Sequence, residues 1–457
     1  MAQADVTRRR FFFGALLAGA VPAAGFGSTP SLRRLGYKSP NEKLNIAAIG
    51  AGGKGASDIA GCAGENIVAL TDPDDKRAEK TFQAFPQLPK YKDFRRMFDK
   101  QGHEIDAVLV SCPDHMHASA AMWAMERGKH VYCQKPLTRT VWEARQLPAA
   151  AAKYGVATQM GNQGYSQPGA RVCCEIVWNG DIGNVTEVHA WTNRPDPYWP
   201  QGPEVVPAEK PVPATLDWDA WLGDAEPRPY SPAYVPHNWR AFPDFGCGAI
   251  GDMACHILGT PNMAMRLTAP TSVECIKLEG KAKYTFPYRT AIRFDFPARG
   301  SMPPLKLSWY DRLKAQPKFD GVPEGELLGD KDINGSLFIG DKGMLTTGCY
   351  GERTRLVPAE KMKDYQLPAP LLTRSPGSDK DWVRSHYADW IRAAKGGDPA
   401  CSNFSVAGPF VQWMLLGTIA MRVEGKLEWD AQAMRFTNNQ QANALLKPKF
   451  RKGWRFA

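Results

Sequence analysis

LNIAAIGAGGKGASDIAGCAGENIVALTD, residues 44–72, is the stretch that decides the fold. Residues 44–49 form a short apolar run, the length expected of a buried parallel strand. Three glycines in a G-x-G-x-x-G spacing follow, and a helix is predicted over about 53–60. A second apolar run, 67–70, ends at Asp72. This order of strand, glycine loop, helix, strand and acid is typical of a βαβ unit that binds a dinucleotide.

Each residue of the motif has a physical role in that reading. Gly50 allows the tight turn, Gly52 lets the backbone approach a pyrophosphate, and Gly55 lets the helix pack on the strand. The helix that begins near Gly53 directs free N–H groups at the phosphates. Asp72 is placed to accept both ribose hydroxyls of NAD. A glycine-rich turn in another kind of α/β protein is the alternative.

The first residues indicate an export signal. The run 7–12 reads TRRRFF, and an apolar stretch to about residue 24 is followed by small residues and proline. This pattern is typical of a twin-arginine signal, so we expect the protein in the periplasm. The apolar stretch is too short to anchor a mature chain in a bilayer. A disordered basic N-terminus or an uncleaved tether is the alternative.

The rest of the chain is long enough for two domains. We predict a signal and linker over 1–37, an NAD-binding Rossmann domain over 38–160 and a substrate-binding α/β domain over 161–457. The net charge of +10 lies partly in the leader and tail, and no basic stripe or nucleic-acid motif accompanies it, so nucleic acid is not an expected partner. The ten cysteines include no C-x-x-C pair or zinc-ligand spacing, and no metal site is predicted.

Between Asp72 and residue 160 apolar strands alternate with helices, which predicts a doubly wound parallel sheet. Ligands of such sheets bind at the carboxyl ends of the strands. Pro113 and the pair Gln134-Lys135 fall at two such ends. Lys135 is therefore placed to hold a substrate hydroxyl and exchange its proton. A surface lysine in a turn is the alternative.

The second half contributes a second candidate group. Asp252 and His256 are spaced i, i+4, so a helix would put both on one face. They fit a proton relay, a structural polar pair, or two ligands of a metal that lacks a third. Arg240 fits contact with a phosphate, a ribose or an anionic substrate, or else a surface ion pair. The aromatic-rich segment 194–236 would either wall a carbohydrate cleft or simply pack itself down.

The chain resembles the Gfo/Idh/MocA family, the relatives of glucose–fructose oxidoreductase and inositol dehydrogenase. The resemblance rests on the glycine fingerprint and on SCPDHMHA at 111–118, CQKPLT at 133–138, GNQG at 161–164, HNWR at 237–240 and FGCGAIGDMACH at 245–256. It implies a Rossmann domain followed by an α/β domain with a large open, mostly antiparallel sheet. It also implies NAD or NADP as cofactor and sugars or cyclitols as substrates.

On these motif positions the resemblance places Lys135, Asp252 and His256 in catalysis. It places Pro113, His117, Gln134, Lys135 and Arg240 beside the cofactor, and Asn162, Gln163, Trp239 and Arg240 beside the substrate. The family's usual tripeptide is Glu-Lys-Pro, whereas this chain has Gln134-Lys135-Pro136. The role of the lysine carries over, and that of the glutamate does not.

We therefore expect an NAD-dependent sugar or polyol oxidoreductase. Asp72 should favour NAD over NADP, although Arg77 is close enough to affect this choice. Because an exported enzyme meets little free NAD, the cofactor should stay tightly bound. A redox-neutral glycoside-cleaving enzyme and a non-catalytic carbohydrate-binding protein are the alternatives. We also expect a homo-oligomer without a stable membrane anchor.

Overall fold

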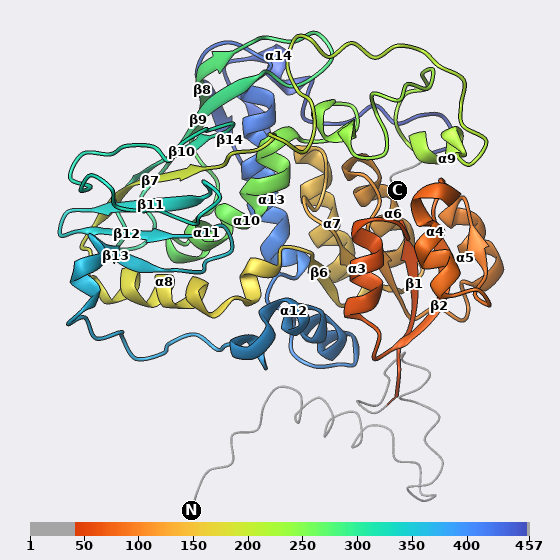
Figure 1. The fold of residues 1–457 in the computed structure, drawn as a ribbon, viewed down its shortest axis with the longest axis horizontal. Coiled ribbons are helices and arrows are strands. Elements are labelled where there is room, and N and C mark those ends of the chain that lie inside the picture. Colours follow the sequence, from red (N-terminus) through yellow and green to blue (C-terminus); the bar gives the residue numbers. More distant parts are fainter. Residues whose placement is uncertain (1–41, 455–457) are drawn as a thin grey trace, which may run out of the picture. The chain divides into compact units, whose positions relative to one another are not determined.

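The computed structural model describes residues 42–454, and from Lys43 onward the chain forms one compact unit built around two sheets (Figure 1). The predicted export signal and linker over 1–37 lie outside the described residues. Among residues 42–454, no helix combines the length and the apolar character needed to cross a bilayer.

The first sheet is parallel throughout and has the strand order β3-β2-β1-β4-β5-β6. Its strands are β1 (Asn45–Ile49), β2 (Asn66–Thr71), β3 (Lys90–Tyr91), β4 (Ala107–Val110), β5 (His130–Cys133) and β6 (Thr158–Met160). The central strands are apolar and buried, because helices cover both faces of a parallel sheet. This order is that of a dinucleotide-binding domain, so the predicted Rossmann fold is confirmed.

Five helices connect these strands. They are α3 (Lys54–Gly61), α4 (Asp75–Ala84), α5 (Phe94–Gln101), α6 (Asp114–Met125) and α7 (Val141–Tyr154). Several begin where a side chain accepts a hydrogen bond from a free N–H of the first turn. Asp74 and Asp93 cap α4 and α5 in this way, and Thr140 with Glu143 forms a capping box on α7. The caps fix where each helix starts above the end of its strand.

The second sheet has the order β13-β12-β11-β7-β10-β9-β8-β14-β15. Its strands are β7 (Val185–Trp191), β8 (Ser272–Glu279), β9 (Arg289–Phe296), β10 (Leu305–Tyr310), β11 (Gly335–Gly340), β12 (Met344–Thr347), β13 (Arg355–Val357), β14 (Leu427–Asp430) and β15 (Arg435–Phe436). Strands β7 and β10 run parallel, and the other pairs are antiparallel. The predicted second domain with a mostly antiparallel sheet is confirmed, while its boundary after residue 160 stays a prediction.

Helix α13 (Phe404–Ala420) joins the two halves. It contacts α7 and β6 of the first half and β8 and η3 of the second. Most of its residues are buried, as expected of a helix that is apolar all round. The remaining helical elements are η1 (Gln163–Ser166), α8 (Pro168–Asn179), α9 (Trp218–Leu222), η2 (Asn238–Ala241), η3 (Ile250–Ala254), α10 (Cys255–Ile257), α11 (Gly259–Ala264), η4 (Ala359–Met362), α12 (Ser378–Ala394) and α14 (Gln440–Asn443).

A segment of the second half crosses to the first. Residues 213–222, here called the strap, carry α9 to a place beside α4 (Figure 1). The backbone N–H of Asp217 donates to Pro73 O at 2.8 Å, and that of Asp75 donates to Thr215 O at 3.1 Å. Lys92 adds a hydrogen bond from Nζ to Thr215 O at 2.7 Å. The strap is thus fixed at the carboxyl end of β2, next to Asp72.

Candidate active site

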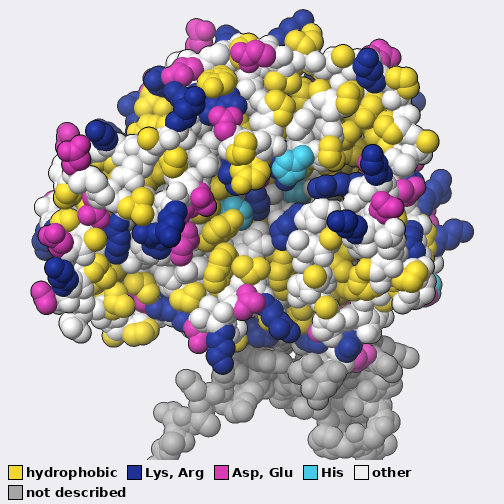
Figure 2. All heavy atoms as spheres, in the orientation of Figure 1, with side chains coloured by type: hydrophobic (Ala, Val, Ile, Leu, Met, Phe, Trp, Pro, Cys, Tyr) yellow, Lys and Arg dark blue, Asp and Glu magenta, His cyan; other side chains and the backbone are white. Residues whose placement is uncertain are grey.

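A cleft of about 410 Å³ opens at the carboxyl ends of β1, β2, β4 and β5, where the strand order of the first sheet reverses. This is the position at which open α/β sheets bind ligands. Segments of the second half complete its walls, including the strap, residues 235–240 and the helix that carries His256. Figure 2 shows histidine side chains and lysine or arginine side chains around a hollow near the centre of this face.

The glycine loop forms one wall. Gly50 has a φ of +87°, and a Cβ there would lie 2.7 Å from the backbone of Ser111. A Cβ on Gly55 would overlap the carbonyl oxygen of Gly50, so the helix packs this closely on the loop only because residue 55 is glycine. Gly53, with φ of +59°, caps α3 without a side-chain hydrogen bond. The N–H of Gly55 donates to Gly52 O at 3.1 Å, and the helix end next to the cleft-lining Gly52 presents the positive end of its dipole to an anion such as a pyrophosphate.

Asp72 ends β2 at the neighbouring position. Its carboxylate accepts hydrogen bonds from the N–H of Gly52 at 2.9 Å and of Asp74 at 3.0 Å. Burial raises the pKa of Asp72 to about 6, against the opposing effect of these hydrogen bonds. The guanidinium of Arg77, a cleft residue that belongs to α4, lies against Gly53. The loop, the helix end and Asp72 fit the pyrophosphate and the ribose of NAD.

Lys135 extends from the end of β5 into a buried ion pair. Its Nζ donates to Asp252 Oδ1 at 2.8 Å and to Asp252 O at 2.7 Å. Arg240 lies on the same carboxylate, with Nε 3.3 Å from Oδ1. Burial alone would raise the pKa of Asp252, but the charges of Lys135 and Arg240 outweigh it and hold the pKa well below its usual range. Asp252 is therefore an anion that fixes the lysine at the cleft.

His256 lines the same cleft, with its ring beside that of Tyr350 at a centroid distance of 4.7 Å. Burial, aided by the charge of Lys135, lowers the pKa of His256 well below its ordinary value, while Asp252 acts in the opposite direction. The imidazole is thus neutral. Within residues 42–454 its buried Nδ1 has no hydrogen-bond partner. A neutral ring beside an ammonium group can accept a proton from a substrate hydroxyl.

The backbone between Asp252 and His256 differs from the regular helix predicted. Residues Ile250–Ala254 form the π-helix η3, and His256 belongs to the short α10 that follows. The predicted regular helix is therefore interrupted by a wider turn between the two residues. Such π-turns occur often at functional sites. Lys135, not the helix geometry, links Asp252 to the cleft.

The remaining predicted cofactor and substrate residues divide into two groups. Pro113, His117, Gln134, Gln163, Trp239 and Arg240 all line the cleft. The ring nitrogens of His117 face the carbonyls of Pro136 and Cys112 at 2.6 and 2.8 Å, so this imidazole is held by the backbone. Trp239 lies under the guanidinium of Arg240, with Cζ 4.1 Å from the ring centroid.

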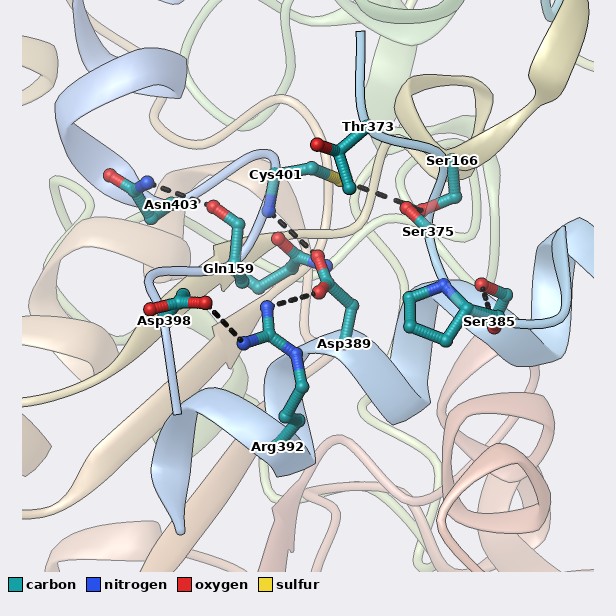
Figure 3. Close-up of polar contacts among 12 residues, drawn as sticks. Gln159, Ser166, Thr373, Ser375, Ser385, Asp389, Arg392, Asp398, Cys401 and Asn403 are labelled. Atoms are coloured by element: carbon teal, nitrogen blue, oxygen red, sulfur yellow. Dashed lines mark hydrogen bonds and ion pairs between the residues drawn. The ribbon is translucent and has the colours of Figure 1, made fainter. Parts of the chain in front are cut away.

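Asn162 is placed differently from the prediction. Its side chain is fully buried outside the cleft, where Oδ1 accepts from Ser402 Oγ at 2.6 Å. Ser402 belongs to the loop over 398–403, which Asp389 holds on α12 (Figure 3). That carboxylate accepts from the N–H of Cys401 and from Arg392, each at 2.7 Å. Asn162 therefore does not line the cleft, and its contact with substrate stays a prediction.

The aromatic-rich segment mainly packs on itself, and its role as a wall for carbohydrate stays a prediction. Trp218, Tyr230 and Tyr234 pack on one another, and Trp199 belongs to the same small core. Only Trp221 of the segment's aromatic rings lines the cleft. Within the described part of the chain, no group of three histidine, cysteine, aspartate or glutamate side chains is placed to hold a metal ion.

Several cleft residues were missed in the sequence. They are Lys54, His237 and Tyr350. Lys54 stands inside the glycine motif and His237 inside HNWR, so their positions carried a signal. Tyr350 follows β12 with no motif around it. Burial raises the pKa of Asp114 to about 7, which adds a titratable carboxyl to the cleft.

Comparison with known proteins agrees with this architecture. Residues 44–162 match the NAD-binding Rossmann fold of an oxidoreductase family, and residues 188–277 match the C-terminal α/β domain of that family. A solved inositol dehydrogenase homologue from Azotobacter vinelandii, in complex with NADH and myo-inositol, has a TM-score of 0.53 at 16% identity, covering 86% of this chain and 100% of its own. At that identity the likeness establishes the fold alone.

Two curated relatives match part of the chain. Inositol 2-dehydrogenase of Serratia proteamaculans is 29% identical over 159 residues, which is 33% of this chain and 46% of that protein. A glycosyl hydrolase family 109 protein of Solibacter usitatus is 28% identical over 191 residues, 38% of this chain and 43% of its own length. The chain thus spans less than half the length of either relative. Both parts of the chain are thus similar to the two domains of the Gfo/Idh/MocA oxidoreductase family, in the same order along the sequence.

Proposed function

We propose that the protein is an NAD-dependent oxidoreductase of sugars or polyols. One observation carries the proposal: the ammonium of Lys135 and the neutral imidazole of His256 line the same cleft as the glycine loop. A cation and a proton acceptor beside a dinucleotide site are the groups that hydride transfer from a hydroxyl-bearing carbon requires.

The first half would hold the cofactor. The N-terminus of α3 and the backbone at Gly52 fit its pyrophosphate, and the Asp72 carboxylate fits a ribose. When bound, NAD supplies the acceptor, or in its reduced form the donor, of a hydride.

Residues from both halves would handle the proton. Lys135 donates a hydrogen bond to the substrate oxygen and stabilises negative charge on it, while Asp252 keeps the ammonium in place. His256 accepts the hydroxyl proton as the carbon–hydrogen bond breaks. The Asp252 charge then favours the imidazolium that results, in agreement with its effect on the pKa of His256. In the reverse direction His256 returns that proton to the alkoxide.

A panel of sugars, polyols and glycosides with product analysis tests the proposal. A ketosugar or other oxidised product supports it. Unchanged sugar with every compound, from protein that contains NAD, would leave only a carbohydrate-binding role.

Retention of the cofactor extends the proposal. The strap is hydrogen-bonded to Pro73 and Asp75, and its Leu216 and Trp221 line the cleft next to Asp72. A cofactor bound beneath it would leave only after these contacts break, so we expect NAD to dissociate slowly. Protein purified without added cofactor, then denatured, should release near-stoichiometric NAD(H). Empty protein that binds NAD weakly would contradict retention.

Retention favours a second candidate, a redox-neutral glycoside-cleaving enzyme that oxidises a sugar and reduces it again with the same bound cofactor. The partial likeness to a glycosyl hydrolase family 109 protein is the observation behind it. Release of an aglycone without net oxidation of the sugar would distinguish it from a dehydrogenase.

Export and assembly stay proposals as well. The TRRRFF run at 7–12 supports transport to the periplasm by the twin-arginine route, and replacing Arg8 and Arg9 with Lys should retain the protein in the cytoplasm. We also propose a homo-oligomer, to be measured by light scattering of the purified protein.

A further inference from the structure

Asp58 is a buried charge that the proposed reaction does not use. The residue belongs to α3, and its side chain is 0% exposed. Four groups donate to its two oxygens, one from the same helix and three from other segments: Lys54 Nζ at 2.7 Å, Ser111 Oγ at 2.6 Å, Gln134 Nε2 at 2.9 and 3.0 Å, and Tyr387 OH at 2.7 Å. A fully desolvated carboxylate needs such partners, because its burial is otherwise very costly.

Gln134 connects this carboxylate to Lys135. Its amide Nε2 faces both oxygens of Asp58, and its Oε1 accepts from the backbone N–H of Lys135 at 3.3 Å. The side chain therefore spans from the buried charge to the residue that enters the ion pair with Asp252. An amide can do this, since it presents a donor on one side and an acceptor on the other.

A carboxylate at residue 134 could not take the same place. It would lie about 3 Å from the Asp58 oxygens, and two like charges at that distance in a buried site cannot both stay ionised. Lys54 is the one lysine or arginine among the groups bonded to Asp58 in the described residues, so a second negative charge would lack a counter-ion. The identity of residue 134 and that of residue 58 are thus coupled.

We infer that Asp58 and Gln134 form a coupled pair that positions Lys135 at the cleft, with Asp58 supplying the one buried carboxylate that this corner of the site accommodates. Asp58 and Gln134 are positioning residues, since neither is assigned a contact with the reacting atoms. The inference rests on the proposed function for its effect on turnover, but the pairing itself is a property of the fold.

A charge-exchange cycle tests the inference. The proteins are the wild type, Gln134→Glu, Asp58→Asn and the double variant Asp58→Asn/Gln134→Glu, which returns one carboxylate and one amide to the pair. We expect Gln134→Glu to lower kcat by about 30-fold or more, with KM for the sugar within about threefold, because the lysine moves while the predicted substrate residues Gln163, Trp239 and Arg240 stay in place. The double variant should recover at least about tenfold of that loss.

Gln83→Glu is the matched control. Gln83 also donates to a carboxylate, Glu79 Oε1 at 3.3 Å, but on the exposed face of α4. The same substitution there should change kcat by less than about twofold, since water screens the new charge.

Urea unfolding of the four proteins separates this inference from the proposed function. If the wild type acts on no sugar, the proposed oxidoreductase function is refuted. Recovery of the urea midpoint in the double variant would still support the coupling of Asp58 and Gln134. Gln134→Glu protein that is insoluble alone but folds as the double variant would support it too. The inference is overturned if the two single effects simply multiply in the double variant, or if Gln134→Glu behaves like Gln83→Glu.

Discussion

Replacing Lys135 with Met keeps most of the side-chain volume and removes the ammonium. The change deletes two hydrogen bonds to Asp252, of 2.8 and 2.7 Å, and leaves Arg240 Nε at 3.3 Å as the nearest cation. Both partners of the lost pair are largely buried, with side chains 15% and 13% exposed. Removal of the lysine therefore leaves the buried Asp252 carboxylate with one cationic partner instead of two.

The size of the effect follows from this geometry. Two unit charges 2.8 Å apart attract by about 6 kcal/mol at an effective dielectric constant of about 20. Breaking a buried pair by removing one partner costs about 3–5 kcal/mol of stability, and Arg240 should reduce this to about 2–3 kcal/mol. Turnover should fall by about 10² or more, because the substrate oxygen loses its hydrogen-bond donor.

The pH dependence has a defined sign. In the wild type the pKa of Asp252 lies below its unfolded value, so its stabilising contribution is present above about pH 4 and is lost as pH falls through the folded pKa. Lys135→Met raises the pKa of Asp252. The stability difference between wild type and variant should thus be largest at neutral pH and shrink on acidification.

Urea unfolding at pH 7.5 measures the loss of stability in Lys135→Met, and stopped-flow absorbance at 340 nm measures its loss of turnover. The double variant Lys135→Met/Asp252→Asn should recover stability without recovering turnover. Lys277→Met is the matched control, because Lys277 pairs with Glu279 at 2.9 Å on the surface of the second sheet. It should leave the rate within about twofold. Turnover of Lys135→Met within about threefold of the wild type would refute the assigned role.

Three further predictions concern the cofactor and the base. NAD affinity should weaken as pH falls through about 6, where Asp72 gains a proton. Asp72→Ser should improve NADPH binding relative to NADH in fluorescence titrations, and an unchanged preference would contradict the placement of Asp72 at the ribose. His256→Ala should lower turnover by about 10² or more and leave NADH affinity within about threefold, and a near-normal rate would remove His256 from the mechanism. Lys92→Met removes the hydrogen bond to Thr215 O and should speed NAD release by about tenfold, whereas Lys90→Met, at an exposed lysine, should not change it. Equal release rates in the two variants would show that the strap does not retain the cofactor.

The first half of the fold could be predicted because its constraints are local. Gly50 and Gly55 occupy positions where a Cβ would meet backbone, so the motif and the geometry determine each other. Asp72 follows its strand at the expected distance. The antiparallel nature of the second sheet, by contrast, came from the family resemblance, since its pairing joins strands far apart in the chain, as β7 with β10.

The candidate site was predictable where a motif marked it and not where packing decides exposure. Lys135 and His256 were placed correctly at the cleft, but the π-turn before His256 has no sequence signal. Asn162 lies within a motif and is nevertheless buried, because the loop over 398–403, distant in sequence, covers it. Asp58 is one residue of an ordinary helix, and only its three partners from other parts of the chain, Ser111, Gln134 and Tyr387, reveal it.

Absorbance at 340 nm, recorded as purified protein that retains its cofactor is mixed with a panel of sugars, tests the central claim most directly. We predict a rapid rise within a single turnover for at least one sugar, and its loss in Lys135→Met and His256→Ala. A protein that retains NAD yet shows no change with any sugar, or variants that respond as fast as the wild type, would contradict hydride transfer at this cleft.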